Sequence, residues 1–104
     1  MILHLINKSI SNSPALDECL SLLQAANKKS AILLLEDAVN AAISNQLNAE
    51  LHAKINALDI PCYVLTEDLQ ARGLLDKIAK GFTQVDYAGF VQLSLEYKKV
   101  QSWA

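Results

Sequence analysis

Two cysteines carry the most reactive side chains in this chain of 104 residues. Cys19 follows Asp17 and Glu18 near the start of an expected helix. The helix dipole lowers the pKa of a thiol there, whereas the two carboxylates raise it, so the net direction stays open. Cys62 lies at the beginning of an apolar segment, which favours a small buried residue. For Cys19, a core position on the helix and a reactive thiol both remain possible.

The two histidines show no metal-ligand spacing. His4 lies in an apolar segment and His52 in a helical pattern, and neither has a cysteine or a second histidine two to five residues away. Zinc and iron sites usually show such pairs of ligands. The sequence therefore predicts no metal site and no bound cofactor. His4 needs a hydrogen-bond partner if its imidazole is buried.

Carboxylates follow two of the apolar segments. Glu36 and Asp37 follow one, and Glu67 and Asp68 open a helical pattern. General acid–base catalysis would need these groups beside a substrate with shifted pKa values, while helix capping and a solvated rim explain them equally well. Arg72, the single arginine, suits a helix end, an ion pair or an interface. No glycine-rich phosphate loop and no nucleophile elbow is present, so we predict no catalytic residue.

Charge and hydropathy exclude several classes of protein. Nine Lys and Arg against eleven Asp and Glu give a net charge of −2, and the basic residues are scattered. A dedicated nucleic-acid-binding protein should show a basic face, because phosphate neutralisation supplies most of its affinity. No apolar run approaches the roughly 20 residues of a membrane span, and residues 1–6 lack a basic leader. Two thiols without a spacing motif fit a reducing compartment, so we expect a cytoplasmic protein without membrane contact.

Apolar runs alternate with helical patterns along the chain. This alternation predicts one α/β domain, residues 1–104, with a mostly parallel sheet of about five short strands flanked by helices. The expected strands are 1–6, 31–35, 60–65, 81–85 and 100–103, and the expected helices cover about 14–23, 38–43, 48–58, 67–72 and 87–95. Ligands of such sheets collect at the carboxyl ends of the strands.

Several helix boundaries have their own signals. Ser13, Thr66 and Asp86 are each placed to cap a helix, and Gly73 is placed to end one. The last helix is expected to turn one apolar face to the core. Its members are Tyr87, Phe90, Val91 and Leu95.

Short motifs distributed over the whole chain resemble the TusB/DsrH family. They are Leu3-His4, Asn7-Lys8-Ser9, the segment 33–39 (LLLEDAV) with Ala41-Ala42, Tyr63-Val64-Leu65, the segment 68–73 (DLQARG), the segment 86–91 (DYAGFV) and the ending 100–103 (VQSW). The chain departs from the family at Ala38, where members often have glycine, and at Ile10, where they often have proline. Both departures concern local backbone geometry.

The resemblance implies a subunit of a sulfur-relay complex. Such a subunit assembles with TusC/DsrF-like and TusD/DsrE-like chains as a dimer of heterotrimers, and the complex passes persulfide sulfur to a TusE/DsrC-like acceptor. In one branch of the family the sulfur reaches 2-thiouridine at the wobble position of tRNA. The partner's sulfur-carrying cysteine lies in the turn after a strand, upstream of an Arg-Gly pair. The matching stretch here, residues 65–73, contains no cysteine.

Three hypotheses follow. In the first, the chain is a structural, non-catalytic subunit beside a TusD-type sulfur carrier, and it needs no direct contact with tRNA. In the second, it is a DsrH-like subunit of dissimilatory sulfur oxidation in which Cys19 itself carries persulfide, since DsrH-type members have a lone cysteine in the first helix. In the third, it is a homo-oligomeric binding module that shares only the fold. Tyr87, Phe90 and Trp103 are the candidate interface residues.

Overall fold

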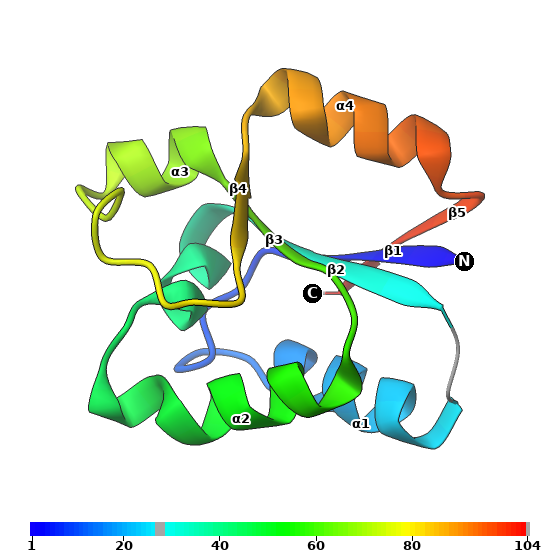
Figure 1. Ribbon diagram of the computed structural model, residues 1–104, viewed down its shortest axis with the longest axis horizontal. Coiled ribbons are helices and arrows are strands. Elements are labelled where there is room, and N and C mark those ends of the chain that lie inside the picture. Colours follow the sequence, from blue (N-terminus) through cyan, green and yellow to red (C-terminus); the bar gives the residue numbers. More distant parts are fainter. Residues whose placement is uncertain (27–28, 104) are drawn as a thin grey trace.

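Five parallel strands form one sheet at the centre of the computed structural model, which describes residues 1–26 and 29–103 (Figure 1). The strand order is β4-β3-β2-β1-β5, and every neighbouring pair is parallel. The strands are β1 (Ile2–Ile6), β2 (Ser30–Leu34), β3 (Cys62–Leu65), β4 (Thr83–Val85) and β5 (Lys99–Trp103). The predicted α/β class and the number of strands are confirmed.

Helices cover the two faces of the sheet unequally. Figure 1 shows α1 and α2 below the sheet and α4 above it. The helical elements are α1 (Ala15–Ala26), the 3-10 helices η1 (Glu36–Ala42) and η2 (Gln46–Asn48), α2 (Ala49–Leu58), α3 (Thr66–Ala71) and α4 (Tyr87–Glu96). None of the helices in the described part of the chain is long and apolar enough to span a membrane.

Alternate residues of the strands supply two separate cores. In β1, Leu3 packs in the core between the sheet and α4, whereas Ile6 packs in the core between the sheet and the helices α1 and α2. This division follows the period of two in a strand. The buried members of the α1–α2 core are Ile6, Leu16, Cys19, Leu20, Leu23, Ile32, Leu34, Ala38, Val39, Ala41, Ala42, Ile55, Cys62, Val64 and Leu69. The buried members of the α4 core are Leu3, Ala31, Leu33 and Leu93.

Two of the three predicted helix caps are observed. Asp86 Oδ1 accepts the Gly89 N–H at 2.8 Å, and Ser13 Oγ accepts the Ala15 N–H at 3.1 Å. Gly73 follows α3 with a φ of 67°, a left-handed conformation that suits glycine. The prediction for Thr66 is wrong. Strand β3 leads directly into α3, so Thr66 is the first residue of the helix and makes no capping hydrogen bond there.

The predicted apolar face of α4 is wrong for three of its four members. Leu93 is buried and Phe90 is half-buried against the sheet, whereas Tyr87, Val91 and Leu95 are 54%, 56% and 76% exposed. These three exposed residues are four apart and form one stripe, which we call the α4 outer stripe. Helical periodicity does not distinguish the two sides, because both sides of α4 carry apolar residues.

Candidate functional site

Both cysteines lie in the α1–α2 core. Cys19 on α1 and Cys62 on β3 are free thiols, exposed to 0% and 2%. Burial raises the pKa of each to about 12, and the neighbouring Cys19 adds to the increase at Cys62. A thiol with this pKa is ionised in roughly one molecule in 10⁵ at pH 7. Because persulfide chemistry needs an accessible thiolate, this arrangement suits core residues better than sulfur carriers.

Side chains at the carboxyl ends of β2 and β3 form a polar network. Glu36, left-handed with a φ of 52°, donates its backbone N–H to Asp68 Oδ2 at 2.6 Å. Arg72 Nη2 pairs with Asp37 Oδ1 at 2.8 Å, and Arg72 Nη1 donates to the backbone oxygen of Asp68 at 3.1 Å. An ion pair is one of the three roles that the sequence predicts for Arg72, and the structure contains it. The network ties η1 to α3.

A second link joins α3 to α4. Glu67 Oε2 accepts the Tyr87 N–H at 3.1 Å. The other carboxylate oxygen of Glu67 and the side-chain oxygen of Asn7 are buried atoms without a partner among the described residues. The carboxyl edge therefore presents hydrogen-bond acceptors, and no thiol lies in residues 65–73.

The two histidines have structural partners. His4 is 1% exposed, and its Nδ1 accepts the indole N–H of Trp103 at 3.1 Å. Burial lowers the pKa of His4. His52 donates from Nε2 to the Ala41 carbonyl at 2.7 Å and packs edge-on against Phe82. Within the described residues, no group of three His, Cys, Asp or Glu side chains is arranged to hold a metal ion.

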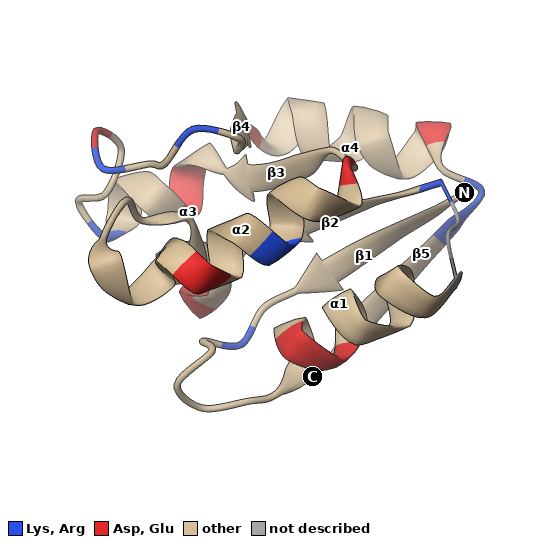
Figure 2. Cartoon of the chain, turned by 60° about the horizontal axis from the view of Figure 1, so that its bottom comes forward, with Lys and Arg blue, Asp and Glu red and all other residues tan. Residues whose placement is uncertain are grey.

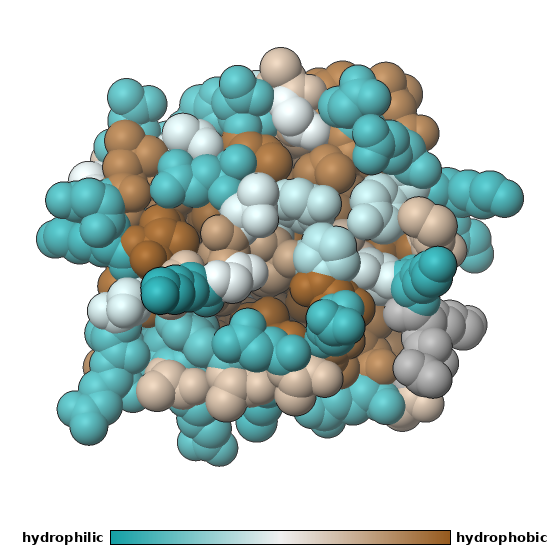
Figure 3. Space-filling model, viewed as in Figure 1, coloured by the Kyte–Doolittle hydropathy of each residue, from teal (hydrophilic) through white to brown (hydrophobic). Residues whose placement is uncertain are grey.

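The three candidate interface residues lie in different surroundings. Tyr87 belongs to the exposed α4 outer stripe, whereas Phe90 packs into the α4 core. Trp103 is half-buried against the α1–α2 core, on the opposite side of the sheet. Figure 3 shows apolar surface at the upper right, where Figure 1 places α4. The structure therefore groups Tyr87 with Val91 and Leu95 and not with the other two candidates.

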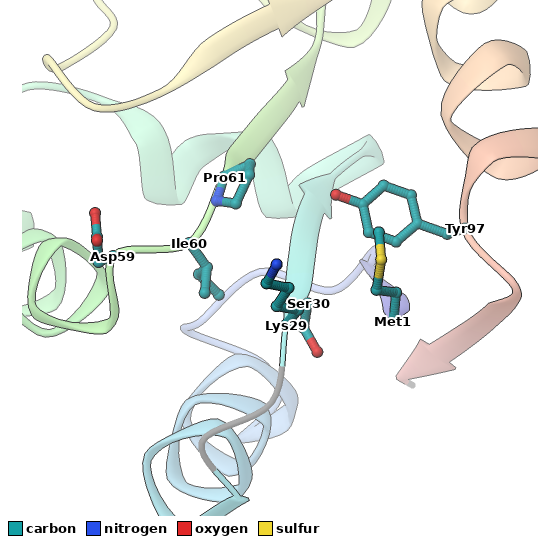
Figure 4. A pocket seen from close by; sticks show the side chains of 7 residues that line it. All are labelled: Met1, Lys29, Ser30, Asp59, Ile60, Pro61 and Tyr97. Atoms are coloured by element: carbon teal, nitrogen blue, oxygen red, sulfur yellow. The ribbon is translucent and has the colours of Figure 1, made fainter.

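A hollow of about 280 Å³ opens at the amino ends of β1, β2 and β3 (Figure 4). It is close to the lower limit for small-molecule pockets and lies at the opposite edge from the polar network. Tyr97, just after α4, forms one side of it. The other lining residues are Met1, Lys29, Ser30, Asp59, Ile60 and Pro61. The hollow contains no thiol and no histidine, so it brings together none of the candidate reactive groups.

Sequence comparison shows the family. The family model described as "DsrH like protein" matches residues 8–100. Proteins named TusB from Shigella dysenteriae and Escherichia coli are each 35% identical to this chain over 95 residues, and the match covers 91% of this chain and 97% of each relative. This chain belongs to the DsrH-like family. The TusB/DsrH resemblance of its motifs is thereby confirmed.

The fold of this DsrH-like chain also matches a solved structure. The crystal structure of the ychN protein from E. coli has a TM-score of 0.82 to this chain, with 97% of each chain covered. The two sequences are only 18% identical, so this likeness shows a shared fold alone.

Two features of this DsrH-like chain carry no clear signal in its sequence. One is the hydrogen bond from Glu36 to Asp68, which depends on a left-handed backbone at Glu36 that no glycine or asparagine signals. The other is the exposure of Leu47, which is 92% exposed in a short 3-10 helix without a periodic pattern. The sequence signals for this network are the acidic pair Glu36-Asp37, which opens η1, and the single arginine.

Proposed function

We propose that this DsrH-like chain is a structural subunit of a cytoplasmic sulfur-relay complex, beside a partner that carries the persulfide. The carboxyl end of β3 carries this proposal. The resemblance puts the partner's cysteine there, and this chain has Thr66, Glu67 and Asp68 instead. The two carboxylates bind the backbones of α4 and η1, so their contacts are structural. The thiols of Cys19 and Cys62 lie in the core.

The α4 outer stripe supports a role in an assembly. Parallel sheets in soluble proteins are normally covered on both faces, and here α4 is the main cover of one face. Tyr87, Val91 and Leu95 leave an apolar row open to solvent on that helix. The side chain of Val100 on β5 is also exposed, at 44%. An apolar patch of this kind suits a surface that a partner covers. Phe90 packs into the α4 core, and Trp103 ties the edge strand β5 to His4 of β1.

The partners in this proposal are TusC/DsrF-like and TusD/DsrE-like chains in a dimer of heterotrimers, with a TusE/DsrC-like protein as sulfur acceptor. The product of the relay is the 2-thiolated wobble uridine of tRNA. Direct binding of tRNA is not required, and the charges agree with this. Lysines and the arginine are spread over separate elements without a basic face in the view of Figure 2.

Co-purification tests the proposed interface. The chain is co-expressed with its TusC-like and TusD-like partners from the same host, and a Val91→Ser/Leu95→Ser variant is compared with Leu22→Ser on α1, which is 46% exposed. The stripe variant should recover at least about tenfold less partner, because apolar anchors dominate interface energies. The α1 variant should recover as much as the wild type. Equal recovery by all three chains would contradict the proposed interface.

A thiolation assay separates the structural role from the Cys19 alternative. Cys19→Ala in a strain that lacks the native gene should restore 2-thiouridine to the wild-type level, because the buried thiol takes no part in transfer. Loss of thiolation by a Cys19→Ala chain that still assembles would favour Cys19 as a persulfide carrier.

A further inference from the structure

Leu47 is the most exposed of the large apolar side chains described, at 92%. It lies on η2, just before α2. Two surface hollows, of about 210 and 320 Å³, adjoin it, and both are lined by Leu47 and Ile10. Ile10, in the loop between β1 and α1, is itself 41% exposed. An exposed apolar side chain with shallow hollows beside it is typical of a surface that contacts another protein.

Charges of both signs border the smaller hollow. It is lined by Asp17 on α1 and by Glu50 and Lys54 on α2. Glu50 and Lys54 are exposed one helical turn apart, and neither forms an ion pair with another described residue. Figure 2 shows the acidic and the basic position side by side on the outward face of α2. The surface thus joins Leu47 to Glu50 and Lys54 on α2, and Asp17 on α1 adds a second acidic side chain at its border.

We propose that this surface binds a second copy of this chain, with the two α2 helices antiparallel about a two-fold axis. A two-fold contact needs a surface that complements itself. Opposite charges one turn apart on a helix meet this condition, because antiparallel pairing puts Glu50 of each copy opposite Lys54 of the other. Leu47 of each copy is then covered by the α2 helix of the other.

The exposed faces of the two helices can approach closely. Beside the charges, α2 exposes the small side chains of Ala49, Ala53 and Ala57, together with Asn56. The charged pairs fix the register, and Leu47 supplies the apolar contact at each end. The proposal is independent of the sulfur-relay function. In a dimer of heterotrimers the same contact would lie on the two-fold axis.

Self-association of the purified full chain tests the proposal. Sedimentation equilibrium at roughly 50 μM chain should give a dimer. Leu47→Ser should weaken the dimer at least about tenfold, because it removes the apolar anchor. Leu95→Ser is the matched control, since it removes another highly exposed leucine, 76% exposed on α4, and it should leave the dimer unchanged. A monomeric wild type, or loss of the dimer through Leu95→Ser and not Leu47→Ser, would overturn the proposal.

A charge swap tests the two-fold geometry directly. Glu50→Lys and Lys54→Glu should each weaken the dimer about tenfold, because each puts like charges opposite one another. The double variant should return to within about threefold of the wild type, since the pairs are restored with their signs exchanged. Failure of the double variant to recover would exclude antiparallel α2 pairing. All three changes are on exposed positions, and circular dichroism melting checks the fold. Failure of self-association would leave binding to TusC-like and TusD-like partners unaffected.

Discussion

Trp103 donates its indole N–H to Nδ1 of His4 at 3.1 Å, joining the last strand to the first across 99 positions of the chain. Because Nδ1 accepts this hydrogen bond, the ring proton of neutral His4 lies on Nε2. That atom is buried and has no partner among the described residues. Strand β5 is an edge strand, and this contact supplements its backbone pairing with β1.

Replacing Trp103 by phenylalanine tests this contact. The change removes the donor and leaves Nδ1 of the buried His4 unpaired, so the free energy of unfolding should fall by about 1–3 kcal/mol. Urea denaturation monitored by circular dichroism measures it. Tyr87→Phe alters an exposed aromatic residue and should change the free energy of unfolding by less than about 0.5 kcal/mol. Equal effects of the two changes would show that the hydrogen bond contributes nothing.

Stability should depend on pH through His4. Burial lowers the pKa of His4 below its ordinary value of 6.5, so the unfolded chain binds the proton more readily than the folded chain. The stability that comes from keeping His4 neutral is therefore fully present above pH 6.5. It decreases as the pH falls below 6.5 towards the pKa of His4 in the folded chain.

Urea unfolding at about pH 7.5 and about pH 5 measures the pH dependence. The wild type should lose more free energy of unfolding between the two values than His4→Gln, in which the buried titrating group is absent. The two chains differ only at position 4, so contributions from the rest of the chain cancel in this comparison. Identical losses in the two chains would contradict a buried neutral His4.

The thiols should resist alkylation in the folded chain. With pKa values of about 12 and almost no exposure, Cys19 and Cys62 should react with iodoacetamide near pH 7.5 at least about 10³ times more slowly than in the urea-unfolded chain. Mass spectrometry counts the added groups. Rapid modification of Cys19 in the folded chain would show an accessible thiol and would favour a sulfur-carrying role.

Asp68 should matter more for stability than Asp37. The Asp68 side chain is 17% exposed and accepts the Glu36 N–H, whereas Asp37 is 64% exposed and pairs with Arg72 at the surface. Asp68→Ala should lower the free energy of unfolding by about 1–2 kcal/mol. Asp37→Ala should lower it by less than about 1 kcal/mol, since exposed ion pairs contribute little. Thermal and urea melts that rank the two changes in the reverse order would contradict this network.

Local patterns predicted the centre of the sheet because β1, β2 and β3 are short, mainly apolar runs bounded by polar residues. The aliphatic run of β2 required cover on both faces, and the structure buries every residue of it. The inward side of α4 could not be predicted in the same way, because Tyr87 and Phe90 are both aromatic and only the position of the sheet decides between them. The cap at Thr66 failed because its position depends on where β3 ends.

The candidate site was predictable only in part. The sequence alone shows that residues 65–73 contain no cysteine, and it indicates a possible ion pair at Arg72. The apolar spacing of α1 predicts that Cys19 is buried, but the sequence alone also allows a reactive thiol at this position. The contact between His4 and Trp103 was not readable, because it joins the two ends of the chain through the pairing of β1 with β5.

Native mass spectrometry of the protein purified gently from its own host tests the central claim most directly. A structural subunit of a sulfur-relay complex should appear in a heterohexamer with TusC-like and TusD-like chains. After mild dissociation, its own mass should be unmodified and the TusD-like chain should carry the additional sulfur. A complex in which this chain carries the sulfur, or a chain that associates only with itself, would contradict the account.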